Sequence, residues 1–350
     1  MKKSLLPLAL AAAVWASPLA SLAASVGDAL QRPALQVSRP DRAILMSAAL
    51  AGRRIVAVGE RGIALFSDDG GAQWRQSQVP TSVSLTAVQF VGEKQGWAVG
   101  HGGVVLHTSD AGATWTLQLD GKRVAALMQE SAQASGDDRA LAEAERLVAD
   151  GPDKPFLDLY FKDAQNGMVI GAYGLSLTTR DGGKTWTSMA DRLDNPGGLH
   201  LYSVQAQGEQ LVIAGEQGLA LLSLDAGTTF RRLTVPYEGT FFRAAWLGQR
   251  SLLLAGLRGQ LWRSDDLGAT WMQVKSPVPV SFSASVQGGQ DTLWLANQAG
   301  GLFSFKAGQL NPKRQAPLPP TAGLLALDGD RLLALTVRGA IIVPIAGDRK

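Results

Sequence analysis

Short apolar runs alternate with glycine-rich turns along most of the chain. Typical runs are Trp97-Ala98-Val99 and Val104-Val105-Leu106, which are rich in β-branched and aromatic residues and are separated by Gly-x-x-Gly. Such runs are typical of strands a few residues long, and glycines that tolerate positive φ are typical of the turn between two antiparallel strands. The pattern therefore predicts an all-β protein.

The unit of two apolar runs and a turn recurs along the chain. Its glycine pairs are Gly59/Gly62, Gly100/Gly103, Gly171/Gly174, Gly215/Gly218 and Gly256/Gly259, with degenerate copies at Asn297/Gly300 and Thr336/Gly339. The first members are 41, 71, 44, 41, 41 and 39 residues apart. The interval of 71 exceeds the others by about 30 residues, which indicates seven repeats and one insertion in the third of them.

Each of the first five pairs is followed by the motif Ser/Thr-x-Asp-x-Gly-x-x-Trp, with phenylalanine in place of tryptophan in the fourth copy. In such a turn the aspartate accepts backbone N–H bonds, the glycine takes the left-handed conformation and the aromatic ring covers the turn. The motif aspartates are therefore expected to be structural; they are Asp69, Asp110, Asp181, Asp225 and Asp266.

One repeat holds about four strands, and repeats of about 40–45 residues with four strands are typical of propeller blades. The chain therefore predicts a single domain over 24–350, a seven-bladed β-propeller. The seventh repeat ends one strand short. We expect residues 34–38, Ala34 to Ser38, to supply the closing strand of the last blade.

The insertion, residues 120–154, has the spacing of helices. Leu141, Ala144 and Leu147 recur at helical intervals, a companion helix is expected over 123–133, and Gly136 separates the two. We expect a helical-hairpin insertion between blades two and three that overhangs one end of the channel. Leu141 and Leu147 are predicted partner contacts; a hairpin that only packs on its own blade is the alternative.

Residues 1–23 have the pattern of a signal peptide. Lys2 and Lys3 precede an apolar run, and Ser21 and Ala23 suit the −3 and −1 positions of a cleavage site. The apolar run is about half of the ~20 residues that a membrane-spanning helix needs. We therefore expect cleavage near Ala23, export to the periplasm and no direct membrane insertion.

Composition narrows the chemistry further. The chain has no cysteine and three histidines, so no disulfide framework or thiol nucleophile is available, and we expect no cofactor and no metal. The 33 Lys and Arg residues face 30 Asp and Glu residues. Without Lys2 and Lys3 the formal net charge is about +1, so no nucleic-acid partner is expected.

The motifs resemble those of a known family. The tandem aspartate motif is the Asp-box of bacterial neuraminidase repeats. Seven repeats, a signal peptide and Gly-x-Arg-Gly turns at Arg61 and Arg258 resemble the photosystem II stability/assembly factor family of propellers, over roughly residues 33–345. The resemblance implies an arginine patch that contacts a membrane protein and, in bacteria without photosystems, an accessory role for another membrane complex.

The arginine turns are the main candidate site. Because the repeats are equivalent, their strand-two to strand-three turns should lie on one face, together with the blade connections. A concave basic surface that also carries aromatic rings suits an anionic protein segment. The alternative is that the arginines are scattered and only keep the turns hydrated. The predicted contacts are Arg61, Arg258, Arg338, His101, Tyr173, Arg192 and Arg314.

These features predict a non-enzymatic periplasmic propeller that helps to assemble, stabilise or operate an inner-membrane protein complex. The resemblance suggests a transporter of the resistance-nodulation-division type as the partner. The alternatives are a sialidase-like glycoside hydrolase and a carbohydrate-binding propeller. A glycosidase needs two carboxylates roughly 5–10 Å apart, for which Glu60 and Glu216 are the candidates beside blade turns.

Overall fold

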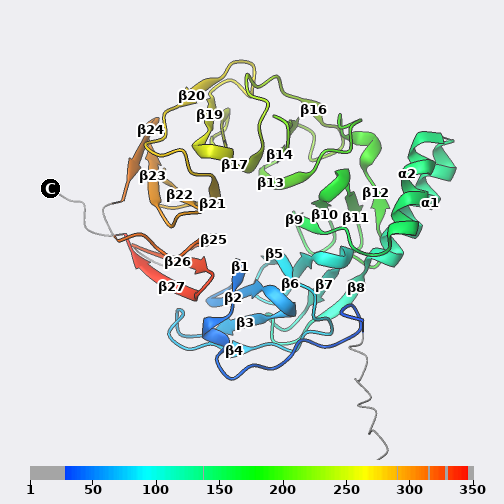
Figure 1. Cartoon of the computed structure of the whole chain (residues 1–350), viewed down its shortest axis with the longest axis horizontal. Helices are drawn as coiled ribbons and strands as arrows, with labels where there is room; N and C mark the ends of the chain where they lie inside the picture. The colour runs from blue at the N-terminus through cyan, green and yellow to red at the C-terminus, as the bar shows by residue number, and fades with distance from the viewer. Residues whose placement is uncertain (1–27, 137, 290, 314–315, 328–329, 346–350) are drawn as a thin grey trace, which may run out of the picture.

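The computed structural model describes residues 28–136, 138–289, 291–313, 316–327 and 330–345. Seven sheets stand around a central channel, and the chain passes once round the ring, so that the first and the seventh blade lie side by side (Figure 1). The predicted seven-bladed β-propeller is confirmed.

Each blade pairs its strands in sequence order, with the first strand at the channel (Figure 1). Blades one to three are β1 (Leu45–Ala51), β2 (Arg54–Gly59), β3 (Ala64–Ser67) and β4 (Arg75–Gln76); β5 (Leu85–Val91), β6 (Gln95–Gly100), β7 (Val105–Thr108) and β8 (Thr116–Leu119); β9 (Phe156–Phe161), β10 (Gly167–Gly171), β11 (Ser176–Thr179) and β12 (Thr187–Ser188).

Blades four to seven repeat the same order. They are β13 (Leu201–Gln207), β14 (Gln210–Gly215), β15 (Ala220–Ser223) and β16 (Arg231–Arg232); β17 (Phe241–Gly248), β18 (Ser251–Gly256), β19 (Leu261–Ser264) and β20 (Met272–Val274); β21 (Phe282–Gln287), β22 (Leu293–Asn297), β23 (Leu302–Lys306) and β24 (Gln309–Pro312); β25 (Thr321–Ala326), β26 (Arg331–Thr336) and β27 (Gly339–Pro344).

The core lies between neighbouring blades. Second strands are buried almost throughout, as in β2 and β18, because both of their faces are covered by adjacent blades. Blades one and seven share a cluster in which Ile55 and Leu65 of the first blade pack with Leu333 and Leu335 of the last. The ring is therefore closed by apolar side-chain packing.

The expectation that residues 34–38 form a strand of the last blade is wrong. The sheet of the seventh blade contains three strands among the described residues. Ala34 N donates to Val79 O (3.0 Å), and Gln76 Nε2 donates to Leu35 O (3.0 Å). The segment thus bonds along the outer edge of the first blade, with Leu35 exposed, and among the described residues it forms no hydrogen bond with the seventh blade's strands.

The Asp-box turns lie at the end of the ring opposite the turns between second and third strands. In the second blade, Thr108 Oγ1 donates to Asp110 Oδ1 (2.8 Å) and Thr114 N to the same oxygen (2.9 Å), while Trp115 Nε1 donates to Gly112 O (3.2 Å). Each of the five motif aspartates accepts such bonds within its own turn. The bonds from residues four positions later hold the pKa of Asp181, Asp225 and Asp266 at about 2.

Asp110→Ala should destabilise the protein by about 1 kcal/mol, because the variant loses an acceptor for Thr114 N, which water can partly replace at this exposed position. Urea denaturation of both proteins measures the difference. The exposed Asp191, which accepts no described hydrogen bond through its side chain, provides the control Asp191→Ala, expected within about 0.5 kcal/mol of the parent. Equal losses for the two variants would contradict a structural role for Asp110.

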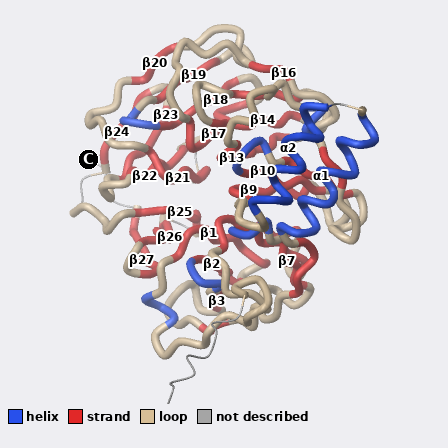
Figure 2. The backbone as a smooth tube through the Cα atoms, turned by 45° about the vertical axis from the view of Figure 1, so that its right-hand side comes forward, coloured by secondary structure: helices blue, strands red, loops and turns tan. Residues whose placement is uncertain are grey.

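The insertion forms the predicted helical hairpin, α1 (Gly121–Ser135) and α2 (Asp138–Asp150). The Asp120 side chain caps α1 by accepting from Arg123 N (2.9 Å), and Gly136 ends the helix in the left-handed conformation (φ 67°). The two helices stand side by side at the outer edge of the ring, next to β12 (Figures 1 and 2). Helix α1 also contacts the turn between β6 and β7, so the hairpin stands at the expected end of the ring, but on its outer edge and not above the channel.

Candidate partner-binding face

The turns between second and third strands lie at one end of the ring, because every blade repeats the same strand order. Four of them are single 3-10 turns: η3 (His101–Gly103) has glycine in the middle, and η2 (Glu60–Gly62), η4 (Ala172–Gly174) and η6 (Leu257–Gly259) have larger residues there. The middle residues share one left-handed conformation, with φ of 56° at Arg61, 57° at Tyr173, 55° at Arg258 and 68° at Gly102. Blade four has Gln217 at this place (φ 52°), a member that the sequence pattern did not single out.

This backbone directs the N–H of the turn toward the next blade connection. Arg61 N donates to Ser84 Oγ (3.3 Å), and Arg258 N donates to Ser281 Oγ (3.1 Å). Both arginine side chains are exposed, and neither forms an ion pair with a carboxylate in the described part of the chain. A non-glycine residue in this conformation costs roughly 1–2 kcal/mol, and blade two uses Gly102 there. The turn itself therefore does not require an arginine.

Arg338 and His101 lie in related turns but differ in detail. Thr336 pairs with Gly339 across the tight β26–β27 turn, and Arg338 N donates to Thr336 Oγ1 (3.0 Å). The positive φ falls on Gly339 (φ 102°), so Arg338 lacks the conformation of the other two arginines. His101 opens the turn η3 (His101–Gly103) and is exposed one position before the shared place.

An aromatic run that the sequence pattern did not reveal links blades three to five. The ring of Tyr173, 61% exposed, meets His200 edge to face (centroids 4.8 Å apart); His200 lies 6.1 Å from Tyr202, which lies 5.2 Å from Phe242. Bulges in β13 and β17 interrupt the strand register at Tyr202 and Phe242. The sequence offered one signal for such a bulge, namely two consecutive large residues at the start of a strand, such as Phe241-Phe242. In a regular strand these two side chains would point to opposite faces of the sheet.

Charged groups accompany the aromatic run. Lys154 Nζ lies 4.8 Å from the centroid of the Tyr173 ring, and His200 Nδ1 lies 2.5 Å from Glu216 Oε2. Hydrogen bonding to Asp153 is the main cause that raises the pKa of Lys154, so this amine is cationic at neutral pH. Glu216, one of the two candidate glycosidase carboxylates, is thus engaged by a neighbouring side chain.

Two opposite charges stand in the inner strands that surround the channel. Asp158 of β9 accepts from Leu159 N and Val204 N (both 2.9 Å), and Arg243 of β17 donates through Nε to Ser283 O (2.8 Å). Burial raises the pKa of Asp158 to about 6, although the charge of Arg243 acts in the opposite direction. These bonds tie blade three to blade four and blade five to blade six.

Asp158 should make the protein more stable as the pH falls from about 6 to about 4. Its pKa in the folded chain lies above the ordinary 3.8, so the folded state takes up the proton at a higher pH than the unfolded state does. Asp158→Asn removes this contribution but keeps an acceptor oxygen, so its stability should vary less with pH in that interval. Urea denaturation at several pH values measures the difference; Asp191→Asn should behave like the parent, and an unchanged slope in Asp158→Asn would refute the assignment.

The two leucines predicted as partner contacts are not exposed anchors. Leu147, Leu127 and Met128 pack against the core cluster between blades two and three, to which Val124 of α1 belongs. Leu141 is half-buried. For Leu147 the structure therefore matches the alternative, a hairpin that packs on its own blade.

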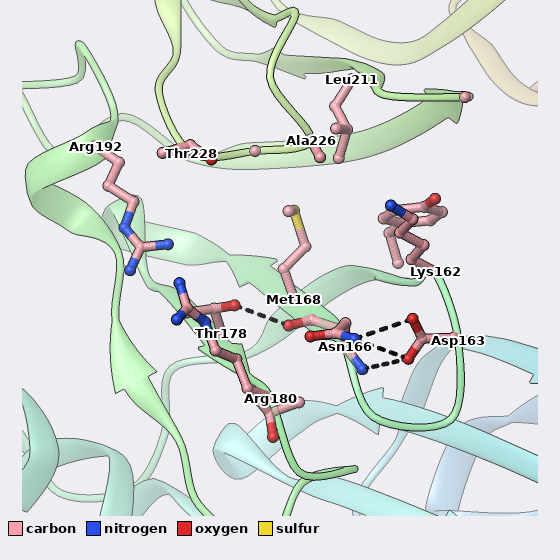
Figure 3. Close-up of a pocket in the computed structure, with 15 residues that line it drawn as sticks. Lys162, Asp163, Asn166, Met168, Thr178, Arg180, Arg192, Leu211, Ala226 and Thr228 are labelled. Atoms are coloured by element: carbon pink, nitrogen blue, oxygen red, sulfur yellow. Dashed lines mark hydrogen bonds between the residues drawn. The ribbon is translucent and has the colours of Figure 1, made fainter.

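Two arginines predicted for this face are elsewhere or outside the description. Arg192 lines a cavity together with Arg180, Ala226 and Thr228, which belong to Asp-box turns at the other end of the ring (Figure 3). The reason is the course of the blade connection, in which Arg192 O accepts from Phe230 N of the next Asp-box. Arg314 and the signal peptide lie outside the described residues.

The described residues contain no group of three or more histidine, aspartate or glutamate side chains placed to hold a metal ion. In the same part of the chain, no helix is both long and apolar enough to cross a membrane.

The fold, the five Asp-boxes and the arginine-bearing turns define an Asp-box β-propeller. The family model described as "Photosynthesis system II assembly factor YCF48" matches residues 42–135 and 140–305. The chain belongs to this family, which confirms the resemblance inferred from the motifs.

Individual relatives are more distant. The chain is 32% identical over 77 residues to "Photosystem II assembly lipoprotein Ycf48" of Synechococcus sp. (strain CC9902), and this match spans 22% of the chain and 23% of the relative. The solved structure "YCF48 bound to D1 peptide" has a TM-score of 0.66 at 18% identity, covering 90% of this chain and all of that one. A GH74 enzyme of Niastella koreensis has a TM-score of 0.61 at 15% identity, covering 87% of this chain and 44% of that one.

Proposed function

We propose that the protein is an exported, non-enzymatic propeller that binds an integral inner-membrane protein complex from the periplasm and assists its assembly or stability. Membership of an assembly-factor family supports a role in building a protein complex. The proposal rests mainly on Arg61 and Arg258. Both residues have the same unfavourable left-handed backbone conformation, and both side chains are exposed without a carboxylate partner in the described chain.

The chemistry of the face suits an acidic segment with apolar side chains. An arginine without an internal partner keeps its planar set of N–H donors for bidentate bonds to carboxylates. Tyr173 offers an exposed ring at the same end of the propeller as the arginine turns, and the aromatic run continues from it toward Phe242. A related structure holds a peptide named D1. We infer that a periplasmic loop or terminus of a membrane protein occupies this face.

The finer proposal names the partner as a transporter of the resistance-nodulation-division type. It rests on the family resemblance for bacteria without photosystems. Affinity purification of the tagged mature protein from detergent-solubilised host membranes tests both levels. One integral membrane complex should be enriched over an untagged control and identified by mass spectrometry. Recovery of no membrane protein would contradict the function, and recovery of a different complex would replace the transporter.

The enzyme alternative has one observation in its favour, the propeller fold shared with a GH74 enzyme. Glu216 is paired with His200, as described above, and Glu60 lies in a turn of the first blade. We expect no hydrolysis of a panel of chromogenic glycosides, sialosides included. Hydrolysis that disappears in Glu60→Gln or Glu216→Gln would reverse this expectation.

A further inference from the structure

A second cationic site lies between blades three and four, at the Asp-box end of the ring and so apart from the arginine turns. The cavity has a volume of about 410 Å³, within the range of about 300–1,000 Å³ that ligand pockets occupy. Figure 3 shows the side chains of Arg180 and Arg192 directed to the same end of this cavity, with Lys162 at the other end.

Within the described ranges, no acidic side chain neutralises the two guanidinium groups. Neither Arg180 nor Arg192 forms a hydrogen bond or an ion pair with a carboxylate among the residues that the structure describes, although Arg192 is half-buried. Asp163 lines the cavity, but its carboxylate is engaged within the β9–β10 turn, where Oδ1 accepts from Gln165 N and Asn166 N (both 2.8 Å). Two cations that face one cavity repel each other unless an anion lies between them.

In two other blades the corresponding position carries an acid that is paired. Arg180 is the second residue of the third Asp-box, where the first has Asp68, the second Ser109, the fourth Leu224 and the fifth Asp265. Arg54 pairs with Asp68 (Nε–Oδ1, 2.6 Å), and Arg263 pairs with Asp265 (Nε–Oδ1, 2.9 Å). Of the five Asp-boxes, the third thus carries a cation at this position, and the neighbouring connection adds a second cation in Arg192.

The rest of the lining is apolar or neutral. Met168 lies between the arginines and Lys162, Leu211 covers the opposite side, and the hydroxyls of Thr178 and Thr228 lie beside the arginine end (Figure 3). An apolar floor next to a guanidinium pair fits a carboxylate on a short aliphatic stem better than it fits a bare inorganic anion, since the stem removes apolar surface from water. We propose that this cavity binds a carboxylate carried on an apolar stem, either a free carboxylic acid or a glutamate side chain of a protein partner.

Isothermal titration of the full mature chain with hexanoate, acetate, inorganic phosphate and a hexaglutamate peptide tests the site. Hexanoate or the peptide should give saturable binding, acetate should bind at least about fivefold more weakly, and the charge-removing variant Arg180→Gln/Arg192→Gln should weaken binding about tenfold or more. Arg180→Lys/Arg192→Lys should fall between them, because lysine keeps the charge but not the bidentate geometry. Tighter binding of the peptide than of hexanoate assigns the ligand to a protein, and the reverse order assigns it to a free acid.

The matched control is Arg250→Gln, an exposed arginine in the β17–β18 turn at the same end of the ring, which should bind like the parent. Melting curves of all variants should coincide within experimental error, which separates loss of binding from unfolding. Saturable binding with neither carboxylate probe, equal binding by parent and Arg180→Gln/Arg192→Gln, or tighter binding of phosphate than of hexanoate would overturn the proposal. None of these results depends on recovery of a membrane partner.

Discussion

Replacing Arg61, Arg258 and Arg338 together with glutamate is expected to abolish recovery of the membrane partner while leaving the melting temperature close to that of the parent. The three side chains are exposed, and their guanidinium groups pair with no carboxylate in the described structure, so each substitution should change stability by no more than about 0.5 kcal/mol. A partner that presents carboxylates would lose three charge-assisted contacts and meet three like charges. We expect its affinity to fall at least about 100-fold.

The chain offers a control variant in which three other arginines are replaced with glutamate. Arg53 and Arg250 are exposed in the turns between the first and second strands of blades one and five, and Arg331 is exposed at the start of β26, the second strand of blade seven, so all three lie at the opposite end of the ring. Their triple glutamate variant carries the same change in net charge but should retain the partner in affinity purification and in binding measured by surface plasmon resonance. Equal losses in the two variants would indicate a general effect of charge, and retention by both would exclude the arginine turns as the binding site.

The number of blades and the site of the insertion could be predicted from the sequence because both depend on local chemistry. A Gly-x-x-Gly turn and an Asp-box each need particular residue types at fixed spacing, and every blade repeats them. The same reasoning correctly placed helices between blades two and three, where Leu141, Ala144 and Leu147 follow the helical period.

The direction of single side chains could not be predicted in the same way. Arg192 was expected among the arginine turns because it lies in a blade connection. That connection runs past the next Asp-box, where Phe230 N bonds to Arg192 O, so the side chain enters a cavity at the other end. Tyr202 was missed for a related reason, because a bulge interrupts the register of β13 at this residue, and the repeat pattern in the sequence does not record bulges.

Ring closure is an intermediate case. In the other blades, the last residue of the strand-two to strand-three turn lies against the connection to the next blade; a Cβ on Gly62 would overlap Thr81 O, and a Cβ on Gly218 would overlap Tyr237 O. In the seventh blade, a Cβ on Gly339 would overlap Asp41 O, in the turn η1 (Pro40–Arg42) near the N-terminus. The N-terminal segment therefore takes the place of a blade connection at the last blade and adds no strand there, contrary to the expectation for residues 34–38.

Gly339→Ala should therefore be one of the most destabilising small substitutions in the protein. Gly339 has φ of 102°, a conformation that alanine adopts only with strain, and the added methyl group would meet a backbone oxygen that cannot rotate away. Strain of roughly 1–3 kcal/mol and a steric cost of similar size predict a loss of about 3 kcal/mol or more. Because the clash separates the first blade from the seventh, the loss should appear as opening of the ring, with faster hydrogen exchange in β1 and β27 than elsewhere.

Two other glycines separate the contributions to this loss. Gly248 has no positive φ, and no atom lies within 4 Å of the place that an added methyl group would take, so Gly248→Ala should be neutral within about 0.5 kcal/mol. Gly92 has φ of 69° and equally open surroundings, so Gly92→Ala should cost about 1 kcal/mol through backbone conformation alone. Urea denaturation of the three variants should give losses in the order Gly248, Gly92, Gly339. If Gly339→Ala costs no more than Gly92→Ala, the contact with Asp41 does not hold the ring closed, and closure rests on the apolar packing of Ile55 and Leu65 against Leu333 and Leu335.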